Sequence, residues 1–213
     1  AQTIRLADLR GEELMQAAES IEFESRRLLN LSEQLLRLSV LNHEPPEFCD
    51  IPAGELMGRV LDAVGPKAAA RGVALEAVPD PETVTTPVSC QPDLMESLLV
   101  NLCDNGVKAC APGGRVVLTF AADGCRAAFT VQDNGRGMDA ATLARIGRPF
   151  YRADKARSRA EGGAGLGVSI CYAIARAHGA ELTYQSRPGQ GTTATLRLAP
   201  HLLQPCNTSE TAR

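Results

Sequence analysis

Two asparagines and a lysine share one face of a predicted helix, and side chains of these types can bind metal ions and phosphate. Asn101, Asn105 and Lys108 stand at positions i, i+4 and i+7 within residues 91–110, beside an apolar stripe. Because asparagine is a mediocre helix former, two of them inside one helix require an explanation. Amide oxygens suit Mg²⁺, which prefers oxygen ligands and retains phosphate oxygens, and the lysine suits phosphate itself. A polar, solvent-exposed helix face is the alternative.

An aspartate stands at the end of a predicted strand, with glycines around it. Asp133, Gly135 and Gly137 directly follow the alternating residues 127–131. The pair Asn134-Gly135 is typical of a hairpin turn, but a polar segment follows instead of a returning strand. A carboxylate in this position, with flexible backbone beside it, is suited to accept a hydrogen bond from the exocyclic amine of a base.

Glycines also precede the predicted helix over residues 166–178. Gly163, Gly165 and Gly167 allow backbone N–H groups to approach phosphates at the positive end of that helix. No strand precedes these glycines, contrary to the dinucleotide-binding fingerprint, and no Gly-Lys-Ser/Thr sequence occurs, which excludes a P-loop. A flexible helix start is the alternative.

A long, polar loop over residues 139–163 separates the two glycine-rich segments. Loops of this length are usually functional, and the glycines at its end would serve as a hinge. Phe150 and Tyr151 are expected to anchor the loop, and Arg152 could reach a terminal phosphate. We therefore predict a mobile lid over a bound nucleotide; a solvated charged loop is the alternative.

The elements that must position these residues are helices and strands in mixed order. This order predicts an α+β fold, with helices on one face of a mixed sheet. Residues 48–200 are predicted to form this domain, and residues 201–213 a disordered tail. We expect helices over 54–71, 91–110 and 166–178, and strands near 73–77, at 116–120 and 127–131 with a turn at Asp123-Gly124, and over 181–186 and 192–198.

The first part of the chain predicts a separate helical unit. Residues 12–41 are expected to form one long helix, with Ile21 and Leu28 among the apolar residues spaced seven apart. Residues 1–9 would be the end of a preceding helix, and residues 42–47 a linker. An apolar stripe of this length requires a partner helix, which favours a dimerising bundle over packing on the chain's own domain.

Composition excludes several classes of protein. The chain has 213 residues, a net charge of -3 and 44% hydrophobic residues, which excludes a disordered chain and a nucleic-acid role carried by bulk positive charge. Aromatic residues make up 4% and Trp is absent, so base-stacking platforms are not expected. No apolar run approaches the length of a membrane span. The seven cysteines form no CxxC pair, which favours buried thiols in a reducing cytoplasm.

In combination, these segments resemble the catalytic domain of sensor histidine kinases. The resemblance covers residues 48–198 in order and spacing, and it implies the Bergerat ATP-binding fold, a two-layer α/β sandwich. Residues 12–41 resemble the second helix of the dimerisation and histidine-phosphotransfer hairpin, so that residues 1–41 would be a truncated hairpin. The matching segments are 101–108 (N box), 133–137 and 163–167 (glycine boxes), 149–152 (F box) and 189–193 (terminal glycine-threonine box).

The resemblance also implies a role for each site residue. Asn101 and Asn105 would hold Mg²⁺, and Asp133 would select adenine through its amino group. Lys108 and Arg152 would contact phosphates and, with Asn105, form the catalytic set. The remaining residues expected to bind ATP are Gly135, Gly137, Gly163, Gly165, Leu166, Gly167 and Thr193.

The sequence departs from the family pattern at two important points. Ala109 stands where an aromatic residue usually stacks near the adenine. No phosphoacceptor box occurs, and His43, His178 and His201 are each expected to be structural or incidental. His178 falls at a helix end, where a cation suits the helix dipole. The acceptor histidine is therefore expected upstream of this chain.

The implied activity is transfer of the γ-phosphoryl group of ATP to a histidine outside this chain, and from there to an aspartate of a response regulator. The full-length protein would be a homodimer, with this part in the cytoplasm and in contact with neither nucleic acid nor membrane. Two alternatives share the fold. One is a serine kinase of the anti-sigma type, for which residues 12–41 are superfluous. The other is a non-hydrolysing nucleotide-binding interaction module.

Overall fold

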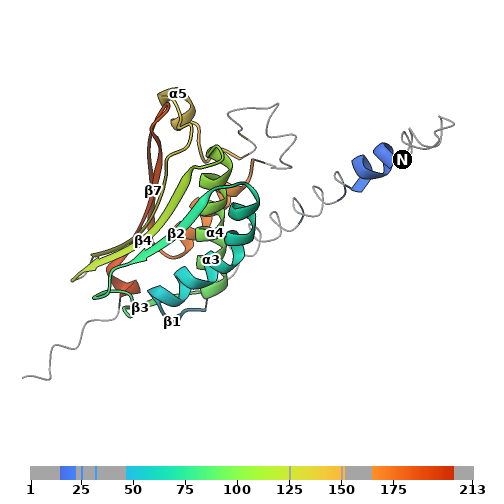
Figure 1. The fold of residues 1–213 in the computed structure, drawn as a ribbon. Coiled ribbons are helices and arrows are strands. Elements are labelled where there is room, and N and C mark those ends of the chain that lie inside the picture. The colour runs from blue at the N-terminus through green and yellow to red at the C-terminus, as the bar shows by residue number, and fades with distance from the viewer. Residues whose placement is uncertain are drawn as a thin grey trace, which may run out of the picture.

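The chain folds into a mixed sheet with helices packed on one face (Figure 1). The computed structural model describes residues 15–22, 25, 32, 47–124, 126–149, 151 and 165–203, apart from the side chain of Pro79. Its elements in chain order are β1 (Cys49–Pro52), α3 (Ala53–Ala70), β2 (Ala74–Pro79), β3 (Pro87–Cys90), α4 (Pro92–Ala109), β4 (Arg115–Asp123), β5 (Arg126–Asp133), α5 (Ala140–Leu143), α7 (Gly167–Ala177), β6 (Glu181–Arg187), β7 (Gly191–Leu198) and the 3-10 turn η1 (Pro200–Leu202).

The main sheet has five strands in the order β2-β4-β5-β7-β6. Strands β2 and β4 run parallel, and the other neighbours are antiparallel. Figure 1 shows α3 and α4 against one face, and α7 contacts α4 and β6. The predicted α+β fold, with a mixed sheet covered on one face, is confirmed, and each predicted helix and strand of the domain is present within a few residues.

Helix α4 is central to the packing and carries the polar stripe. Gln91 caps its start by accepting a hydrogen bond from the backbone N–H of Leu94 at 2.5 Å, and a proline follows at the first turn. Its apolar stripe is buried, and each fully buried leucine contributes about 1.5–3 kcal/mol. The helix is therefore held at a fixed rotation, with its polar stripe to one side. The buried residues are Met95, Leu98, Leu99, Leu102, Cys103, Gly106 and Val107.

The prediction of a disordered tail from His201 is wrong for its first three residues. Leu202 and Leu203 are 0% and 8% exposed, and Leu203 forms a bridge with Val88 of β3. These apolar side chains complete the core beside the antiparallel pair β1 and β3, which periodicity did not predict because strands of four residues carry little signal. Residues 204–213 lie outside the described residues.

His178 is structural, as predicted, but it is not a cation at the helix end. It is 1% exposed, its Nε2 accepts a hydrogen bond from the Gln91 N–H at 3.1 Å, and its Nδ1 lies 2.8 Å from the Ile174 carbonyl oxygen. Burial lowers the pKa of His178, so the ring is neutral and carries its proton on Nδ1. His201 is exposed, and His43 lies outside the described residues.

Four of the described cysteines are buried free thiols, as predicted: Cys90, Cys103, Cys110 and Cys171. Burial raises the pKa of Cys90, Cys103 and Cys171 to about 12, which keeps these thiols protonated and unreactive. Cys49 is also free, but it is exposed.

Only part of the predicted long helix is described. Residues 15–22, 25 and 32 are helical, while residues 1–9 and most of the linker lie outside the described residues. None of the helices in the described part of the chain combines the length and apolarity that a membrane span requires.

Candidate functional site

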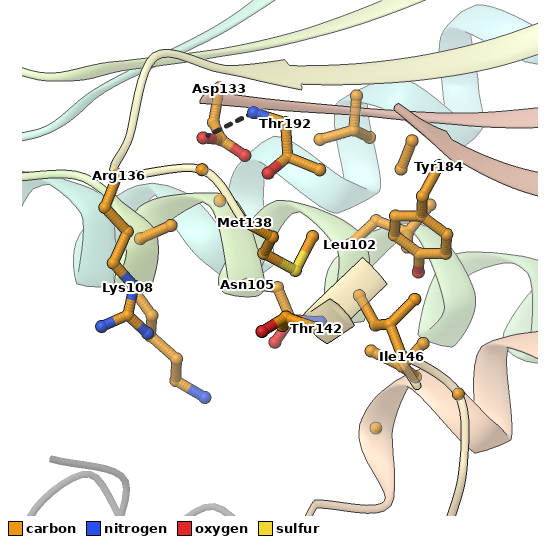
Figure 2. A pocket seen from close by; sticks show the side chains of 18 of the residues that line it. Leu102, Asn105, Lys108, Asp133, Arg136, Met138, Thr142, Ile146, Tyr184 and Thr192 are labelled. Atoms are coloured by element: carbon orange, nitrogen blue, oxygen red, sulfur yellow. Dashed lines mark hydrogen bonds between the residues drawn. The ribbon is translucent and has the colours of Figure 1, made fainter. Parts of the chain in front are cut away.

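The candidate site is a cavity of about 550 Å³ beside the polar stripe of α4. Its wall combines the end of β5 and the following loop, the start of α7 and the facing strands β6 and β7. In Figure 2 the side chains of Lys108 and Arg136 run together on one side of the cavity, and Tyr184 and Ile146 stand on the other. The cavity therefore has a cationic side and a more apolar side.

Asp133 is a buried carboxylate on the cavity wall and is 8% exposed. Its Oδ1 accepts hydrogen bonds from the Gly135 N–H at 2.8 Å and the Thr192 N–H at 3.2 Å, the second of which is drawn in Figure 2. Burial raises the pKa of Asp133, although both N–H groups oppose the shift. Among the described residues, Oδ2 accepts no hydrogen bond, so it is available to a donor on a ligand.

Glycines bring the backbone around Asp133 closer together than side chains would allow. A Cβ on Gly135 would lie 2.7 Å from the carbonyl of Ala109, at the end of α4. Gly137 has a φ of +65°, and a Cβ there would collide with the carbonyl of Arg187. The loop after β5 is therefore held tightly between α4 and the turn that joins β6 to β7.

The two asparagines of α4 both line the cavity. The Nδ2 of Asn101 donates to the carbonyl of Ser97 at 2.8 Å, which orients the amide and leaves Oδ1 toward the start of α7. A Cβ on Gly167 would lie 3.1 Å from that oxygen, so a glycine allows α7 to begin close to the amide. Asn105, one turn further on, is exposed within the cavity.

Lys108 lines the cavity and is held by a neighbouring carboxylate. Its Nζ lies 2.6 Å from Oδ2 of Asp104, and Lys67 of α3 pairs with the other oxygen. Burial alone would raise the pKa of Asp104, but the two lysines together hold it below its usual value. Asp104 therefore remains ionised and offsets part of the positive charge beside the cavity.

The structure brings most of the predicted site residues together. Gly135 and Leu166 pack behind the wall instead of lining it: Gly135 is buried against α4, and Leu166 is 1% exposed. Arg152 and Gly163 lie outside the described residues. The predicted residues that line the cavity are Asn101, Asn105, Lys108, Asp133, Gly137, Gly165 and Gly167.

Thr193, which the sequence predicted to bind ATP, is not among the residues that line the cavity, whereas its neighbour Thr192 is. Successive side chains of a strand point to opposite faces of the sheet, so of two adjacent threonines only one can face the helices. Thr192 lines the cavity, and its N–H donates to Asp133. The register supports this assignment, because Thr192 pairs with Asp133 on β5 and with Ser186 on β6.

The sequence did not identify the apolar side of the cavity. Met138, Ile146, Tyr184 and Ala194 line it, and they come from two strands and from the segment after β5. Strand alternation could have indicated Tyr184, which shares the helix-facing side with the buried Leu182. No sequence signal places Met138 or Ile146, because both follow the irregular path of the chain after β5.

The fold is that of a known class of ATPase domains. The model of the family "Histidine kinase-, DNA gyrase B-, and HSP90-like ATPase" matches residues 90–202. The chain belongs to this family. The predicted relationship to the catalytic domain of sensor histidine kinases is thereby confirmed, and the relatives specify it further.

Several curated relatives are named as sensor kinases. The chain is 32% identical over 190 residues to the sensor histidine kinase YkoH of Bacillus subtilis. This aligned region covers 88% of the present chain and 40% of YkoH. The histidine protein kinase DivJ of Caulobacter vibrioides is also 32% identical over 190 residues, covering 88% of this chain and 31% of DivJ. The chain thus spans less than half the length of these relatives.

Solved structures show the same fold. ShkA, crystallised at full length in complex with AMPPNP, superposes with a TM-score of 0.75 at 24% identity, covering 94% of this chain and 41% of ShkA. The catalytic domain of the histidine kinase ThkA has a TM-score of 0.63 at 21% identity, covering 73% of this chain and 98% of that domain.

Proposed function

We propose that this chain is the ATP-binding catalytic part of a two-component sensor histidine kinase. The observation that carries the proposal is the buried Asp133 carboxylate, held by two backbone N–H groups beside a cavity that Asn105 and Lys108 also line. A buried acceptor together with amide and cationic groups suits a molecule with an amino-bearing base and phosphates. The names of the relatives support the reaction class.

Phosphoryl transfer requires positioning and charge stabilisation from the protein more than covalent chemistry. In the proposed reaction, the bond from the γ-phosphorus to its bridging oxygen breaks, a P–N bond forms to a histidine outside this chain, and ADP leaves. The phosphoryl group then passes to an aspartate of a response regulator. Lys108 and Arg152 would hold the phosphates, and Asp133 would hold the adenine.

Asn101 and Asn105 are proposed to hold Mg²⁺ through their amide oxygens. The hydrogen bond from Asn101 Nδ2 to Ser97 leaves Oδ1 available, which fits this role. The described residues contain no group of three or more His, Cys, Asp or Glu side chains that could hold a metal ion. The amides would therefore share the ion with phosphate oxygens and water, as Mg²⁺ prefers. When bound, Mg²⁺ would supply charge neutralisation on the phosphates.

We also propose that the full-length protein forms a homodimer through the helix predicted over residues 12–41. Ile21, a member of the predicted apolar stripe, is 38% exposed in the single chain, and Met15 is 66% exposed. Apolar side chains on a helix without a covering partner favour a helical bundle. Because the proposed donor is ATP and the proposed final acceptor is a receiver domain, we also propose that this part of the protein lies in the cytoplasm.

A labelling experiment tests the proposal against its two alternatives. The chain should bind ADP in calorimetry but should not label itself with [γ-³²P]ATP, and adding the parent's upstream helix should restore an acid-labile label. An acid-stable label on serine would favour the anti-sigma type of kinase. Nucleotide binding without any transfer, even when the parent's upstream helix is present, would favour the interaction module. An acid-labile label on the chain alone that His43→Gln abolishes would place the acceptor within this chain.

A further inference from the structure

The hydroxyl of Tyr184 is a buried polar group that has no hydrogen-bond partner among the described residues, and Tyr184 lines the cavity. Tyr184 lies in β6 directly opposite the small Ala194 of β7, and both line the cavity. Its ring centroid lies 6.1 Å from that of Tyr172 on α7. The hydroxyl is shielded from solvent and forms no hydrogen bond with the described residues. Figure 2 shows the ring on the opposite side of the cavity from Lys108.

The lack of a partner for this hydroxyl needs an explanation. Buried side-chain polar atoms are nearly always hydrogen-bonded, because an unpaired donor keeps the full cost of its desolvation. Two other buried oxygens of the described residues also lack a hydrogen bond. One belongs to Asp104 and is paired with Lys67, and the other belongs to Thr83, in the turn between β2 and β3. Tyr184 alone of the three lines the cavity.

Polar side chains in the next row of the sheet that faces the helices form hydrogen bonds within the protein. In the next row of the sheet, Ser186 accepts a hydrogen bond from the Met138 N–H at 2.8 Å and donates to the Gly191 carbonyl at 2.8 Å. In that row, one carboxylate oxygen of Asp133 accepts hydrogen bonds from two backbone N–H groups. The described residues therefore provide partners for Ser186 and for one oxygen of Asp133, but none for the phenol.

The surroundings of the phenol fit a flat, aromatic ligand group with a polar edge. Met138, Ile146 and Ala194 line this part of the cavity with apolar atoms. Burial raises the pKa of the Tyr184 phenol well above its usual value, so its proton is retained and can be donated. An aromatic base presents apolar faces and carries ring nitrogens that accept hydrogen bonds in its plane.

We propose that the Tyr184 hydroxyl donates a hydrogen bond to a ring nitrogen of the bound nucleotide base. The inference rests on the proposed function in that the ligand is a nucleotide. Asp133 then accepts from the amino group of the base, while Tyr184 donates to one of its acceptors. The two residues together recognise a donor and an acceptor on the same ring system, which makes Tyr184 a specificity-determining residue of this pocket.

Tyr184→Phe tests the proposal because it removes only the hydroxyl. ADP should bind about 3- to 10-fold more weakly, the range expected for one hydrogen bond. Without nucleotide, the melting temperature should stay the same or rise, because an unpaired buried donor has been removed. Tyr172→Phe is the matched control: it removes the same atom from the adjacent ring, which does not line the cavity, and should leave ADP affinity unchanged.

Base analogues identify the contact directly. The wild-type chain should bind one of 1-deaza-, 3-deaza- and 7-deaza-ADP more weakly than ADP, and Tyr184→Phe should lose nothing further with that analogue. Equal ADP affinity in Tyr184→Phe and the wild type would overturn the inference, as would weaker binding without coupling to any ring nitrogen or a lower melting temperature without nucleotide. Failure of the wild-type chain to bind ADP would instead overturn the proposed function, and this inference with it.

Discussion

The Asp133 side and the α4 side of the cavity are built in different ways. At the Asp133 side, the carboxylate is 8% exposed and held by two backbone N–H groups, and glycines fix the surrounding chain. At the α4 side, Asn105 is exposed, and Lys108 is held by another side chain, Asp104. One side is fixed by backbone and burial, and the other consists of side chains that can exchange partners.

This difference assigns distinct tasks to the two sides. A buried acceptor with a fixed geometry discriminates between ligands, because a wrong group leaves a desolvated charge unpaired. Side chains paired with each other can exchange one charged partner for another at modest cost, since partly exposed ion pairs are weak. We therefore expect base selectivity from the Asp133 side and adaptable phosphate binding from the α4 side.

The largest expected effect comes from Asp133→Asn, which breaks the fixed side. The amide keeps an acceptor for the Gly135 N–H but places its NH₂ donor where the ligand amine also donates. A hydrogen bond to a charged group contributes about 1.5–3 kcal/mol, so ADP should bind roughly 10–150-fold more weakly. Calorimetric titration measures this loss, and a melting curve should show a folded protein. Unchanged ADP affinity would show that Asp133 does not contact the base.

The pH dependence of binding provides a second test of the same side. Burial raises the pKa of Asp133, so ADP affinity should fall as the pH drops through that raised value, by about tenfold per pH unit below it. At higher pH the carboxylate is ionised and this residue contributes no slope. In the protein without nucleotide, the free energy of unfolding depends on pH in the opposite direction. It falls as the pH rises through the raised pKa of Asp133, because ionisation of the buried carboxyl is unfavourable. The ADP affinity of Asp133→Asn should lack this dependence on pH. If the variant and the wild type showed the same pH profile of ADP affinity, Asp133 would not be the group that contacts the base.

On the other side, Asn105→Ala should act through the metal and not through the base. Binding of ADP without metal should remain nearly intact, and the gain in affinity on adding Mg²⁺ should be lost, because one amide ligand is gone. Calorimetry with and without Mg²⁺ measures this gain. Asn105→Asp is the informative companion, and if both variants respond to Mg²⁺ as the wild type does, Asn105 is not a ligand.

The same contrast explains what the sequence could predict. Asn101, Asn105 and Lys108 share a stripe of a regular helix, so spacing alone placed them together, and the structure brings all three to the cavity. Alternating residues likewise predicted where the five strands of the main sheet lie along the chain. Periodicity is a local property, and it predicts well wherever neighbours in the sequence are also neighbours in space.

Features that depend on pairing between distant segments were missed or misplaced. The choice of Thr192 over Thr193 depends on which face of β7 meets the helices, and a shift of one residue reverses it. The orphan hydroxyl of Tyr184 depends on a small residue in the neighbouring strand. Leu203 is buried because it meets Val88, far away in the sequence.

The smallest expected effect comes from Asp104→Asn, which decides how adaptable the α4 side is. Asp104 pairs with both Lys108 and Lys67, and it is ionised in the folded protein. Removing its charge leaves the positive charge of Lys108 less compensated and available to phosphate. We expect ADP affinity to rise about two- to fivefold at low salt, and the gain to shrink as salt screens the charges.

The variant should also lose some stability, because two ion pairs are removed. Lys67 is about half exposed, so the free energy of unfolding should fall by only about 0.5–1 kcal/mol at neutral pH. The two lysines lower the pKa of Asp104 in the folded protein. The stability that Asp104 contributes is therefore present at pH values above its pKa in the unfolded chain, and it is lost as the pH falls through its lowered pKa in the folded protein. Glu55→Gln is the matched control, since it removes one carboxylate from an exposed pair with Arg59 outside the cavity. A lower ADP affinity in Asp104→Asn would show instead that Asp104 positions Lys108 for the phosphate, and both sides of the cavity would then be fixed before the nucleotide binds.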